Sequence, residues 1–572
     1  MIVPMKHLFL LCVADESDAT LEKLRDIGAV HLEFAAGVEK GGMGDEAKVR
    51  LERAERAVRV AEKAVKECGV AKRGGSGVGV DEILALDEKR DGLKAEAESL
   101  KATIRMYEPF GDFDPELAKS LEAAGVKVEL LDDGTYRILY GGEEPEGKPG
   151  VRRLPLPSER ISVTRAKLAE VEKSIGAVTS QIAAADVDEI FSEFPGLRDA
   201  VAFAEAKDEL SASVTQQIAV VRGWIAEDDV PALEAAAKGN GWGLAFRDPD
   251  AGETPPTLIR PPKLFRPVKA LFDGLGIAPA YSEADVSVPF MCYFSLFFAM
   301  LVGDGGYGAI ILALTLFGWR KYRAMKKPAP LLKSWLVLLT VFSSATVAWG
   351  LVSNTWFGAG LPFAAEWPTV KWLGDPTYGN MMLLCFTIGA SHLILARVWS
   401  GLCMLNDRTC LSQFGWAGIV LFMYLVTNSI VGIFGGIPQW AYWMFGVSLV
   451  LVFGFTLKGS ELKSRGIELG MLPLNIMSAL GDIISYVRLF AVGLASVKVA
   501  QNFNDMAVGL DLPLWLKVVP MVLILLVGHG LNFAMAGLSI LVHAVRLNTL
   551  EFSNHKGISW AGYAFRPFRK TA

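Results

Sequence analysis

The sequence predicts an α+β cytosolic domain, made of two small α/β lobes joined by an antiparallel coiled-coil arm, followed by an all-α membrane domain of eight transmembrane helices. The 572 residues are 52% hydrophobic and have a mean hydropathy of +0.33, which is too apolar for an ordinary soluble protein. Residues 1–260 carry 49 of the 62 acidic and 34 of the 57 basic groups, a net charge of about −15, whereas residues 261–572 carry about +10. This division predicts a water-soluble domain over 1–260 and a membrane domain with basic flanks after it.

Two strand–helix–strand patterns at opposite ends of the acidic part predict one ferredoxin-like lobe. The first pattern covers residues 2–35 and the second covers 216–248. We therefore expect a proximal lobe formed by residues 1–40 and 213–250. The apolar start of the chain is too short to span a membrane, and acidic residues follow it at once, so we expect a strand rather than a signal peptide.

Charged, helix-periodic segments fill the gap between the two halves of this lobe. They predict an arm that runs out over 45–107 and back over 160–212, with a distal lobe at 110–155. The alternative is a helical bundle of a regulatory domain. A lever with a lobe at each end suits mechanical bridging between partners. The acidic part shows no phosphate loop, metal cluster or nucleophile–base pair, so we expect no catalysis, cofactor, metal or nucleic acid there.

The apolar segments of the second part predict the membrane topology. They lie at 289–318, 333–352, 380–398, 412–435, 439–457, 471–500 and 513–546. The first would be about 45 Å long as one helix, against a bilayer core of about 30 Å, and it contains GDGGYG (303–308) at its middle. The loop after it is strongly basic and belongs in the cytosol.

A turn at GDGGYG therefore gives eight passes with both termini cytosolic. The membrane domain is expected at 289–552, after a linker at 261–288 and before a cytosolic tail at 553–572. The motif also fits the GxGxxG pattern, but no βαβ unit surrounds it, so we expect no bound nucleotide. Gly303, Gly305 and Gly308 instead permit a tight turn and close helix contact. Asp304 is expected to cap a half-helix, the alternative being a pair with a membrane cation.

Arg488 lies in the middle of an apolar run, residues 477–500. Its guanidinium keeps its charge at any accessible pH and costs a few kcal/mol or more at the centre of a bilayer. On a regular helix it shares a face with Ser485 and with mostly small residues: Gly481, Ala491, Val492, Ala495 and Val499. Such a face admits a neighbouring helix closely. The alternative is a static ion pair with Asp304 or Asp482.

The last apolar segment carries Asn532, Ser539 and Arg546 at intervals of seven, with His543 one turn before Arg546. A polar stripe along a membrane helix normally faces protein or water. Because Arg546 lies near the cytosolic end, the alternative for it is a side chain that snorkels to the interface. Both of the last two segments exceed the length needed to span, so we expect long, tilted helices.

The motifs SYVRLFAVGLA (485–495), GHGLNFAMAGLSILVHAVRLNTLEF (528–552), GDGGYG, VRGWIAEDDVPALEAA (221–236) and PPTLIRPPKLFRPV (255–268) together resemble the I/a subunit of V-type rotary ATPases, in its bacterial and archaeal form. The resemblance covers nearly the whole chain and is weakest in the arm. It implies that Arg488 and Arg546 meet a rotating ring of c/K proteolipids, whose carboxylates bind H⁺ or Na⁺. A fixed guanidinium favours the ionised carboxylate and blocks direct leakage between two half-channels.

The resemblance further implies a stationary, non-hydrolysing subunit of an ion-translocating complex in a bilayer, the plasma membrane in a prokaryote. Its partners would be the ring, peripheral-stalk E/G heterodimers and the central-stalk C/d subunit, with no nucleotide bound directly. We expect Ser485, Asn532, Ser539 and His543 to line the ion path, and Glu551 and Glu468 to polarise its cytosolic mouth. Ser496 replaces a histidine of eukaryotic relatives, and FSNHKGISW replaces the usual KFY after Glu551. The choice between H⁺ and Na⁺ stays open.

Two other classes of function remain as alternatives. A secondary transporter with a regulatory domain would show repeated membrane halves, and the sequence has no internal repeat. A membrane scaffold that transports nothing would leave Arg488 and the polar stripe of the last helix without a role.

Overall fold

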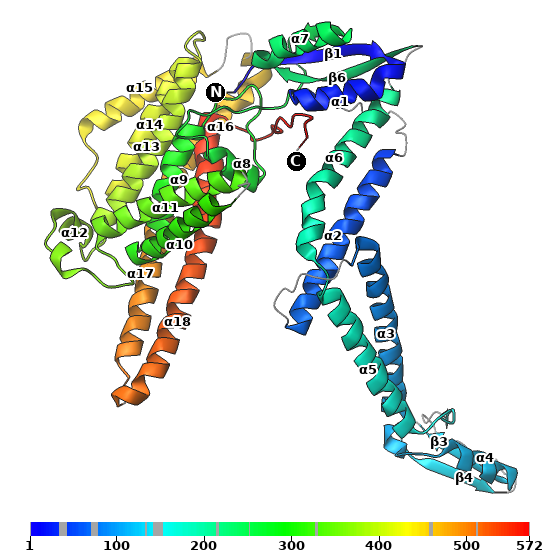
Figure 1. The fold of residues 1–572 in the computed structure, drawn as a ribbon. Helices are drawn as coiled ribbons and strands as arrows, with labels where there is room; N and C mark the ends of the chain where they lie inside the picture. The colour runs from blue at the N-terminus through cyan, green and yellow to red at the C-terminus, as the bar shows by residue number, and fades with distance from the viewer. Residues whose placement is uncertain are drawn as a thin grey trace. The chain divides into compact units, whose positions relative to one another are not determined.

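The computed structural model describes residues 2–33, 43–69, 78–131, 134–140, 153–212, 217–250, 252–325, 330–456, 462–510 and 513–570. It is mostly helical, with α/β lobes in its first half (Figure 1). Two compact units are present. One consists of Met1–Lys6 and Asp248–Arg566, and the other of His7–Arg247 and Pro567–Ala572.

The proximal lobe is a four-stranded sheet in the order β2-β6-β1-β7, in which β1 pairs antiparallel with β7 and β2 with β6. Its elements are β1 (Met5–Val13), α1 (Ser17–Ile27), β2 (Val30–Leu32), β6 (Ile218–Ala226), α7 (Val230–Asn240) and β7 (Gly243–Arg247). Alternating residues of β1, such as Leu8 and Leu10, are buried against Leu21 and Leu24 of α1. This strand order is ferredoxin-like, as the two sequence patterns predicted.

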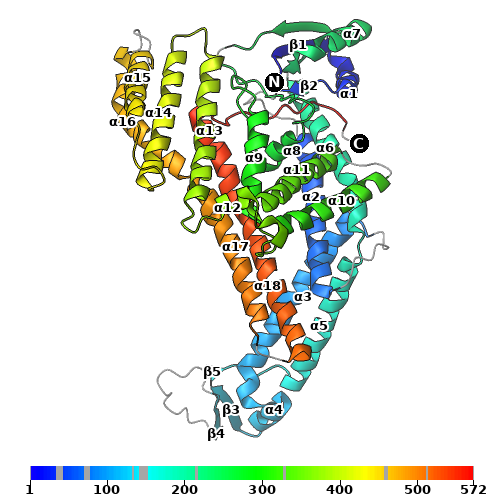
Figure 2. The same cartoon turned by 90° about the vertical axis from the view of Figure 1, so that its left-hand side faces the viewer.

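Four long helices join the lobes: α2 (Met43–Cys68), α3 (Val80–Tyr107), α5 (Ile161–Ala183) and α6 (Val187–Ala212). In Figures 1 and 2, α2 lies beside α6 and α3 beside α5. Helix α2 turns a stripe of small residues, Ala54, Ala57, Ala61 and Ala64, into a buried core. The return path, predicted as helical throughout 160–212, is interrupted between α5 and α6.

The distal lobe is a three-stranded antiparallel sheet in the order β4-β3-β5, with one helix. Its elements are α4 (Pro115–Ala123), β3 (Val126–Leu131), β4 (Tyr136–Tyr140) and β5 (Arg153–Leu154). Asp114 caps α4 by accepting a hydrogen bond from the Glu116 amide. The Arg160 guanidinium, which is hydrogen-bonded to Asp114, lowers the pKa of that carboxyl group below its ordinary value.

The other unit contains most of the apolar helices: α8 (Val268–Leu275), α9 (Ser287–Val302), α10 (Gly305–Ala324), α11 (Pro330–Ser353), α12 (Pro368–Leu373), α13 (Gly379–Cys403), α14 (Cys410–Ile430), α15 (Gln439–Phe455), α16 (Leu462–Ile484), α17 (Val487–Val508), α18 (Leu514–Ser539) and α19 (Ser553–Lys556). Among the described residues, five helical stretches are long and apolar enough to cross a membrane: Leu331–Ser353, Gly379–Cys403, Cys410–Ile430, Gly470–Val508 and Trp515–Lys556. Two more apolar helices, α9 and α15, are shorter. The count of eight passes stays a prediction.

The predicted linker at 261–288 contains helix α8, whose Val268, Leu271 and Phe272 are buried in the core of this unit. The predicted break at GDGGYG is present. Helix α9 ends at Val302, Gly303 has a φ of +69°, and α10 starts at Gly305. A glycine suits that conformation because a side chain would be strained there. Helix α10 then packs beside α11 (Figure 2).

Candidate functional site

Arg488 is the second residue of α17, just after a break in the helix. The sequence predicted one continuous helix over 471–500, but α16 ends at Ile484 and α17 begins at Val487. Tyr486, at the break, is buried and its hydroxyl is hydrogen-bonded to His392 Nδ1 over 2.8 Å. Its ring occupies the space over Gly389, where a Cβ atom would come within 2.6 Å. Tertiary packing on α13 therefore holds the break that positions Arg488.

The Arg488 side chain is held at two points. Its Nε donates to the Ser485 carbonyl over 2.8 Å, and one terminal nitrogen donates to Glu551 Oε1 over 2.6 Å. Arg546 Nε lies 3.5 Å from the same carboxylate oxygen. The side-chain exposures are 6% for Glu551, 22% for Arg488 and 56% for Arg546. Two guanidinium groups thus share one buried carboxylate, and the cluster keeps a net charge of +1.

Glu551 is positioned by its neighbour in the chain. Phe552 stacks on the His392 ring with 4.5 Å between centroids. The same imidazole bonds to Tyr486, so one histidine fixes both sides of the Arg488–Glu551 pair. Oxygen Oε2 of Glu551 is buried and meets no hydrogen-bond donor among the described residues. The carboxylate therefore has unused capacity to accept a hydrogen bond.

The ion-pair partner of Arg488 among the described residues is Glu551. Sequence reasoning considered Asp304 and Asp482 as static partners and placed Glu551 at the cytosolic mouth. Asp482 instead pairs with His555 Nε2 over 3.0 Å, and Asp304 is engaged by backbone amides. Glu551 is 63 residues from Arg488, a separation that no local pattern reveals.

The polar stripe of the last helix has regular α-helical spacing from Asn532 to Ser539, but Arg546 follows a π-helical stretch. Beyond Ser539 the chain forms two π-helical stretches, Ile540–Ala544 and Leu547–Phe552. A π turn holds more residues than an α turn, so a spacing of seven no longer returns to one face. Asn532 is fully buried, whereas Arg546 is half exposed. Isolated π turns occur often at functional sites, and these two flank Arg546.

Two other predicted site residues, Ser485 and Ser539, bond to nearby backbone carbonyls. Ser485 Oγ donates to the Asp482 carbonyl and Ser539 Oγ to the Met535 carbonyl. His543 is partly buried, and its Nδ1 finds no partner among the described residues. Glu468 belongs to α16, and its side chain lies outside the described part of the chain.

Asp304 joins the turn motif to a later loop. Its carboxylate accepts hydrogen bonds from the amides of Gly306, Phe357 and Gly358 over 2.7, 2.8 and 2.8 Å. The first of these bonds is the cap of α10 that the sequence predicted. A buried carboxylate with three amide donors is well stabilised without a cationic partner. The role of Asp304 as a helix cap is confirmed.

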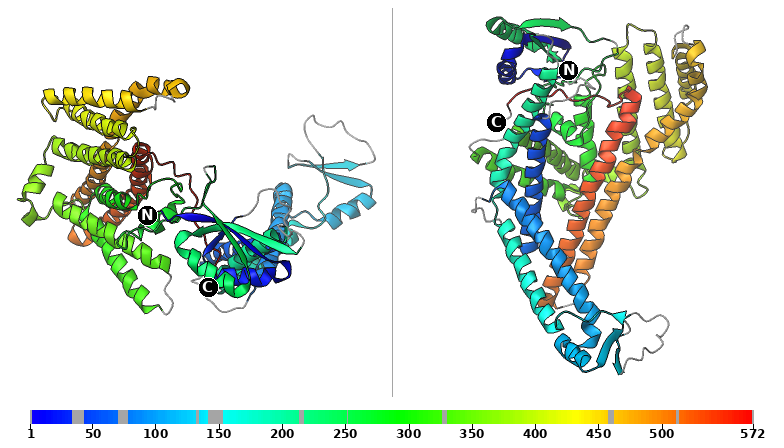
Figure 3. Two further views of the ribbon diagram at one scale, coloured as in Figure 1. Left: turned by 90° about the horizontal axis from the view of Figure 1, so that it is seen from above. Right: turned by 90° about the vertical axis from the view of Figure 1, so that its right-hand side faces the viewer.

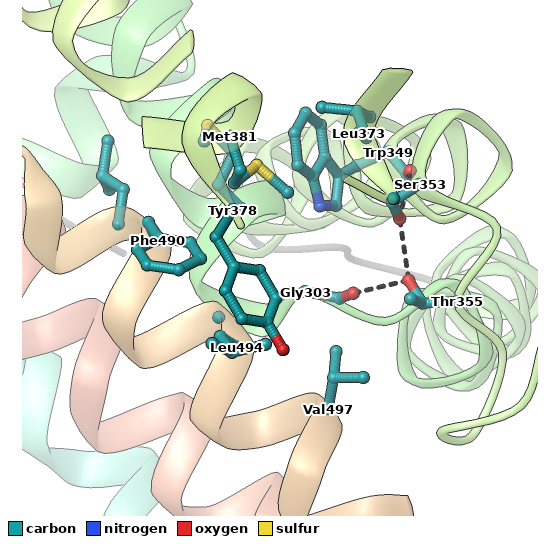
Figure 4. A pocket seen from close by; sticks show the side chains of 14 residues that line it. Gly303, Trp349, Ser353, Thr355, Leu373, Tyr378, Met381, Phe490, Leu494 and Val497 are labelled. Atoms are coloured by element: carbon teal, nitrogen blue, oxygen red, sulfur yellow. Dashed lines mark hydrogen bonds between the residues drawn. The ribbon is translucent and has the colours of Figure 1, made fainter. Parts of the chain in front are cut away.

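A cavity of about 150 Å³ lies beside α17, on the side where α17 faces α9, α11 and α13 (Figure 4). Trp349, Tyr378, Phe490, Leu494 and Val497 contribute much of its apolar wall. At one end Thr355 bonds to Ser353 Oγ and to the Gly303 carbonyl, each over 2.7 Å. Close backbone packing of α9 on α17 adjoins it, since a Cβ atom at Gly493 would lie 2.5 Å from the Met300 carbonyl oxygen. One side of α17 is therefore fixed.

A different side of α17 is exposed. Ala491, Ala495 and Lys498 mark it at helical spacing after Arg488. Helix α18 runs side by side with α17 and exposes Gly530, Ala534 and Gly537 together with many leucines and valines (Figure 3, right). Apart from Arg488 and Lys498 this surface is apolar and rich in small residues, as expected of a helix face that meets another membrane helix.

A second polar cluster was missed by sequence reasoning, which counted Arg397 only as a loop charge. Arg397 Nε donates to His555 Nδ1 over 3.0 Å, and its NH1 donates to Gln413 over 3.1 Å. Asp482 lies on the far side of His555, and Arg397, Asp482 and His555 line a cavity of about 540 Å³. His555 belongs to the segment that departs from the usual KFY, and that departure was the one available signal.

No family model matches the chain. A V-type ATP synthase subunit I from Borreliella burgdorferi is 27% identical over 627 residues, which cover 100% of both chains. V-type ATP synthase subunit I 1 from Treponema pallidum is 28% identical over 646 residues, again 100% of both. The chain is a relative of subunit I of the V/A-type ATP synthases.

An archaeal subunit I is also similar. The A-type ATP synthase subunit I of Methanocaldococcus jannaschii is 25% identical over 454 residues, covering 72% of this chain and 64% of its own. The solved cytoplasmic N-terminal domain of a V-ATPase subunit I, described as a homolog of subunit a, matches 42% of this chain and 100% of its own at 14% identity. Its TM-score is 0.14, so this likeness carries no argument. The resemblance to subunit I read from the motifs is confirmed by the full-length relatives.

Proposed function

We propose that the chain is the stationary membrane subunit of a V/A-type rotary ATPase and forms two ion half-channels against a ring of c/K subunits. The observation that carries this proposal is the Arg488–Glu551–Arg546 cluster. It holds one uncompensated positive charge next to an exposed face of small residues on α17 and α18. The relationship to subunits I supports the same assignment.

The electrostatic role of Arg488 follows from Coulomb's law. A ring carboxylate about 4 Å from the guanidinium would gain about 4 kcal/mol in its ionised form at an effective dielectric constant of about 20. That gain drives the bound H⁺ or Na⁺ off the ring subunit that passes Arg488. Glu551 keeps the guanidinium in place between encounters, and the residual charge leaves it attractive to a second carboxylate.

The remaining predicted residues take places around this centre. Asn532, Ser539, His543 and Ser485 would line the ion path, and Glu468 its cytosolic mouth. Eight passes with both termini cytosolic fit the ten helices from α9 to α18, since α12 is too short to span and α16 and α17 together form one pass. The chain would hydrolyse no ATP itself.

The first half of the chain would act in the stator. Its two lobes and four long helices suit a lever that binds peripheral-stalk E/G heterodimers, with the central-stalk C/d subunit meeting the ring nearby. The segment around Phe568 packs onto the proximal lobe. Phe568 is buried in the core of this lobe, and its amide donates to the Val30 carbonyl over 2.7 Å.

Replacing Arg546 tests how much its charge contributes. Its closest contact with Glu551 is 3.5 Å, too long for a strong bidentate bond, so charge should matter more than guanidinium shape. We expect Arg546→Lys to keep most ATP-driven ion uptake by vesicles containing the complex, and Arg546→Ala to lower uptake roughly fivefold, the equivalent of about 1 kcal/mol. Equal defects in both variants would contradict a role for charge. A wild-type complex that shows no ATP-driven uptake would overturn the proposed function.

Shortening the arm tests the stator role. Deleting residues 70–186 removes α3, α5 and the distal lobe but leaves α2 paired with α6, so the Phe203, Ala206 and Leu210 contacts of α6 with the proximal lobe remain. We expect the shortened chain to enter the membrane and bind the ring but to lose the peripheral stalks on native gels. A complex that retains its stalks would show that they bind elsewhere.

A further inference from the structure

A chain of hydrogen-bonded polar side chains links α10, α17 and α18 away from the arginine cluster. Asn532 Nδ2 donates to the Tyr307 hydroxyl over 3.0 Å, that hydroxyl lies 2.7 Å from His529 Nδ1, and His529 Nε2 lies 3.1 Å from Asn504 Oδ1. Asn504 Nδ2 then donates to the Phe357 carbonyl over 2.6 Å. Polar side chains are costly among apolar helices, so a continuous series of them indicates a function.

The direction of every hydrogen in the series follows from its two ends. At one end, Asn532 Nδ2 also donates to the Ser496 carbonyl over 2.8 Å, which fixes the orientation of that amide. At the other end, the Phe357 carbonyl fixes Asn504, so Oδ1 faces His529 and accepts from Nε2–H. His529 Nδ1 is then unprotonated and accepts the hydroxyl proton of Tyr307. Both ends specify the same imidazole tautomer.

The inner end of the series has an unused acceptor. Asn532 is fully buried, and its Oδ1 meets no hydrogen-bond donor among the described residues. A buried orphan acceptor costs about 1–3 kcal/mol, which a water molecule would recover. The outer end is accessible, since the bond from Asn504 to the Phe357 carbonyl is exposed. The series therefore runs from a buried acceptor to an exposed end.

Its position relative to Arg488 follows from helix geometry. Ser496 is eight residues after Arg488 and Asn504 is sixteen, so the series begins roughly 12 Å and ends roughly 24 Å along α17 from the arginine. With both termini cytosolic, this direction leads to the outer side of the membrane.

We propose that Tyr307 and His529 carry protons through the outer half-channel, so that the transported ion is H⁺. This inference rests on the proposed function and specifies the ion. Imidazole accepts and releases protons near neutral pH, whereas Na⁺ needs a path of oxygen ligands. The hydrogen-bonded series from Asn532 to Asn504 includes the His529 imidazole, which can pass on a proton but is not an oxygen ligand for Na⁺.

The transfer balances without a further reactant. A proton released from a ring carboxylate reaches water at Asn532 Oδ1 and passes to the free lone pair of the Tyr307 oxygen, while the tyrosine gives its own hydroxyl proton to His529 Nδ1. The imidazolium then loses its Nε2 proton to a water molecule that takes the place of Asn504 Oδ1 at the exposed end. One proton enters and one leaves, and tautomer exchange of His529 resets the series. In ATP synthesis the protons move in reverse.

The test uses the intact complex in sealed vesicles, with ATP-driven H⁺ uptake and Na⁺ uptake measured separately. We expect Tyr307→Phe, which keeps the packed ring, and His529→Ala each to lower H⁺ uptake by at least about tenfold, with assembly on native gels unchanged. External imidazole should restore part of the uptake in His529→Ala, and Tyr307→His should transport better than Tyr307→Phe. Tyr424→Phe on α14, which removes a hydroxyl bonded to Thr387, is the matched control and should transport normally.

The outcomes separate the two proposals. If Arg488→Ala abolishes uptake while Tyr307→Phe and His529→Ala leave it normal, the proton path is elsewhere and the proposed function stands. Wild-type Na⁺ uptake that persists with a protonophore would overturn the assignment of H⁺. Normal uptake in Arg488→Ala would instead overturn the proposed function. Loss of uptake in both relay variants with rescue by imidazole would support the proton path.

Discussion

Arg488→Ala is expected to abolish ATP-driven ion uptake by vesicles that contain the complex, while the complex still assembles. The lost attraction, about 4 kcal/mol at about 4 Å, corresponds to a roughly 1,000-fold weaker preference for the ionised ring carboxylate. The ring would then keep its ion as it passes α17, and nothing would prevent an ion from crossing between the half-channels. Assembly should survive because Arg546 Nε, 3.5 Å from Glu551, leaves that carboxylate a cation nearby.

The matched control for this variant is Lys498→Ala. Lys498 is a cation on the same exposed side of the same helix, and its ammonium group is bonded to Gln501 over 3.1 Å rather than to a carboxylate. We expect its removal to leave uptake unchanged. Uptake by Arg488→Ala at the wild-type rate would overturn the central assignment, and an equal loss in Lys498→Ala would show that the requirement for a cation is not specific to position 488.

Much of the fold follows from patterns that are local in the sequence. Alternation in β1 and β6 and the glycines of GDGGYG specify strands and a helix break by their own chemistry, and the structure has them where the sequence placed them. The break between α16 and α17 has no such signal. Neither of the two residues at the break, Ser485 and Tyr486, is a glycine or proline. The break depends instead on the contacts of Tyr486 with His392 and Gly389, which lie far from Tyr486 in the sequence.

The candidate site was predictable in its charges but not in their pairing. Arg488 and Arg546 stand out because a guanidinium is costly in an apolar segment. Glu551, the partner of Arg488, lies in the π-helical stretch Leu547–Phe552, which the residue spacing of this segment does not predict. The assumption of a regular helix therefore grouped Asn532 with Arg546, although the structure buries the first and exposes the second. Tyr307 and His529 meet only through the fold, being 222 residues apart.

Exchanging the charges of Arg488 and Glu551 distinguishes an ion-translocating arginine from a structural ion pair. Arg488→Glu alone places two acidic groups together, and Glu551→Arg alone gathers three guanidinium groups, so each single variant should lose about 3–5 kcal/mol of stability. The double variant restores an opposite-charge pair at the same two positions and should regain most of that stability. A thermal unfolding series on the detergent-solubilised complex measures the recovery.

Ion uptake is expected to remain lost in the double variant even where stability returns. A structural pair needs only opposite charges at two places, so a swap would restore everything that such a pair contributes. The proposed function needs a cation at position 488, 22% exposed beside the small-residue face, because only that charge meets the ring carboxylate. A glutamate there would repel the carboxylate and favour its neutral, ion-loaded form. Recovered uptake in the double variant would therefore identify Arg488 as a structural residue. Recovered stability without uptake would instead require that the charge of Arg488 act on a group outside this chain.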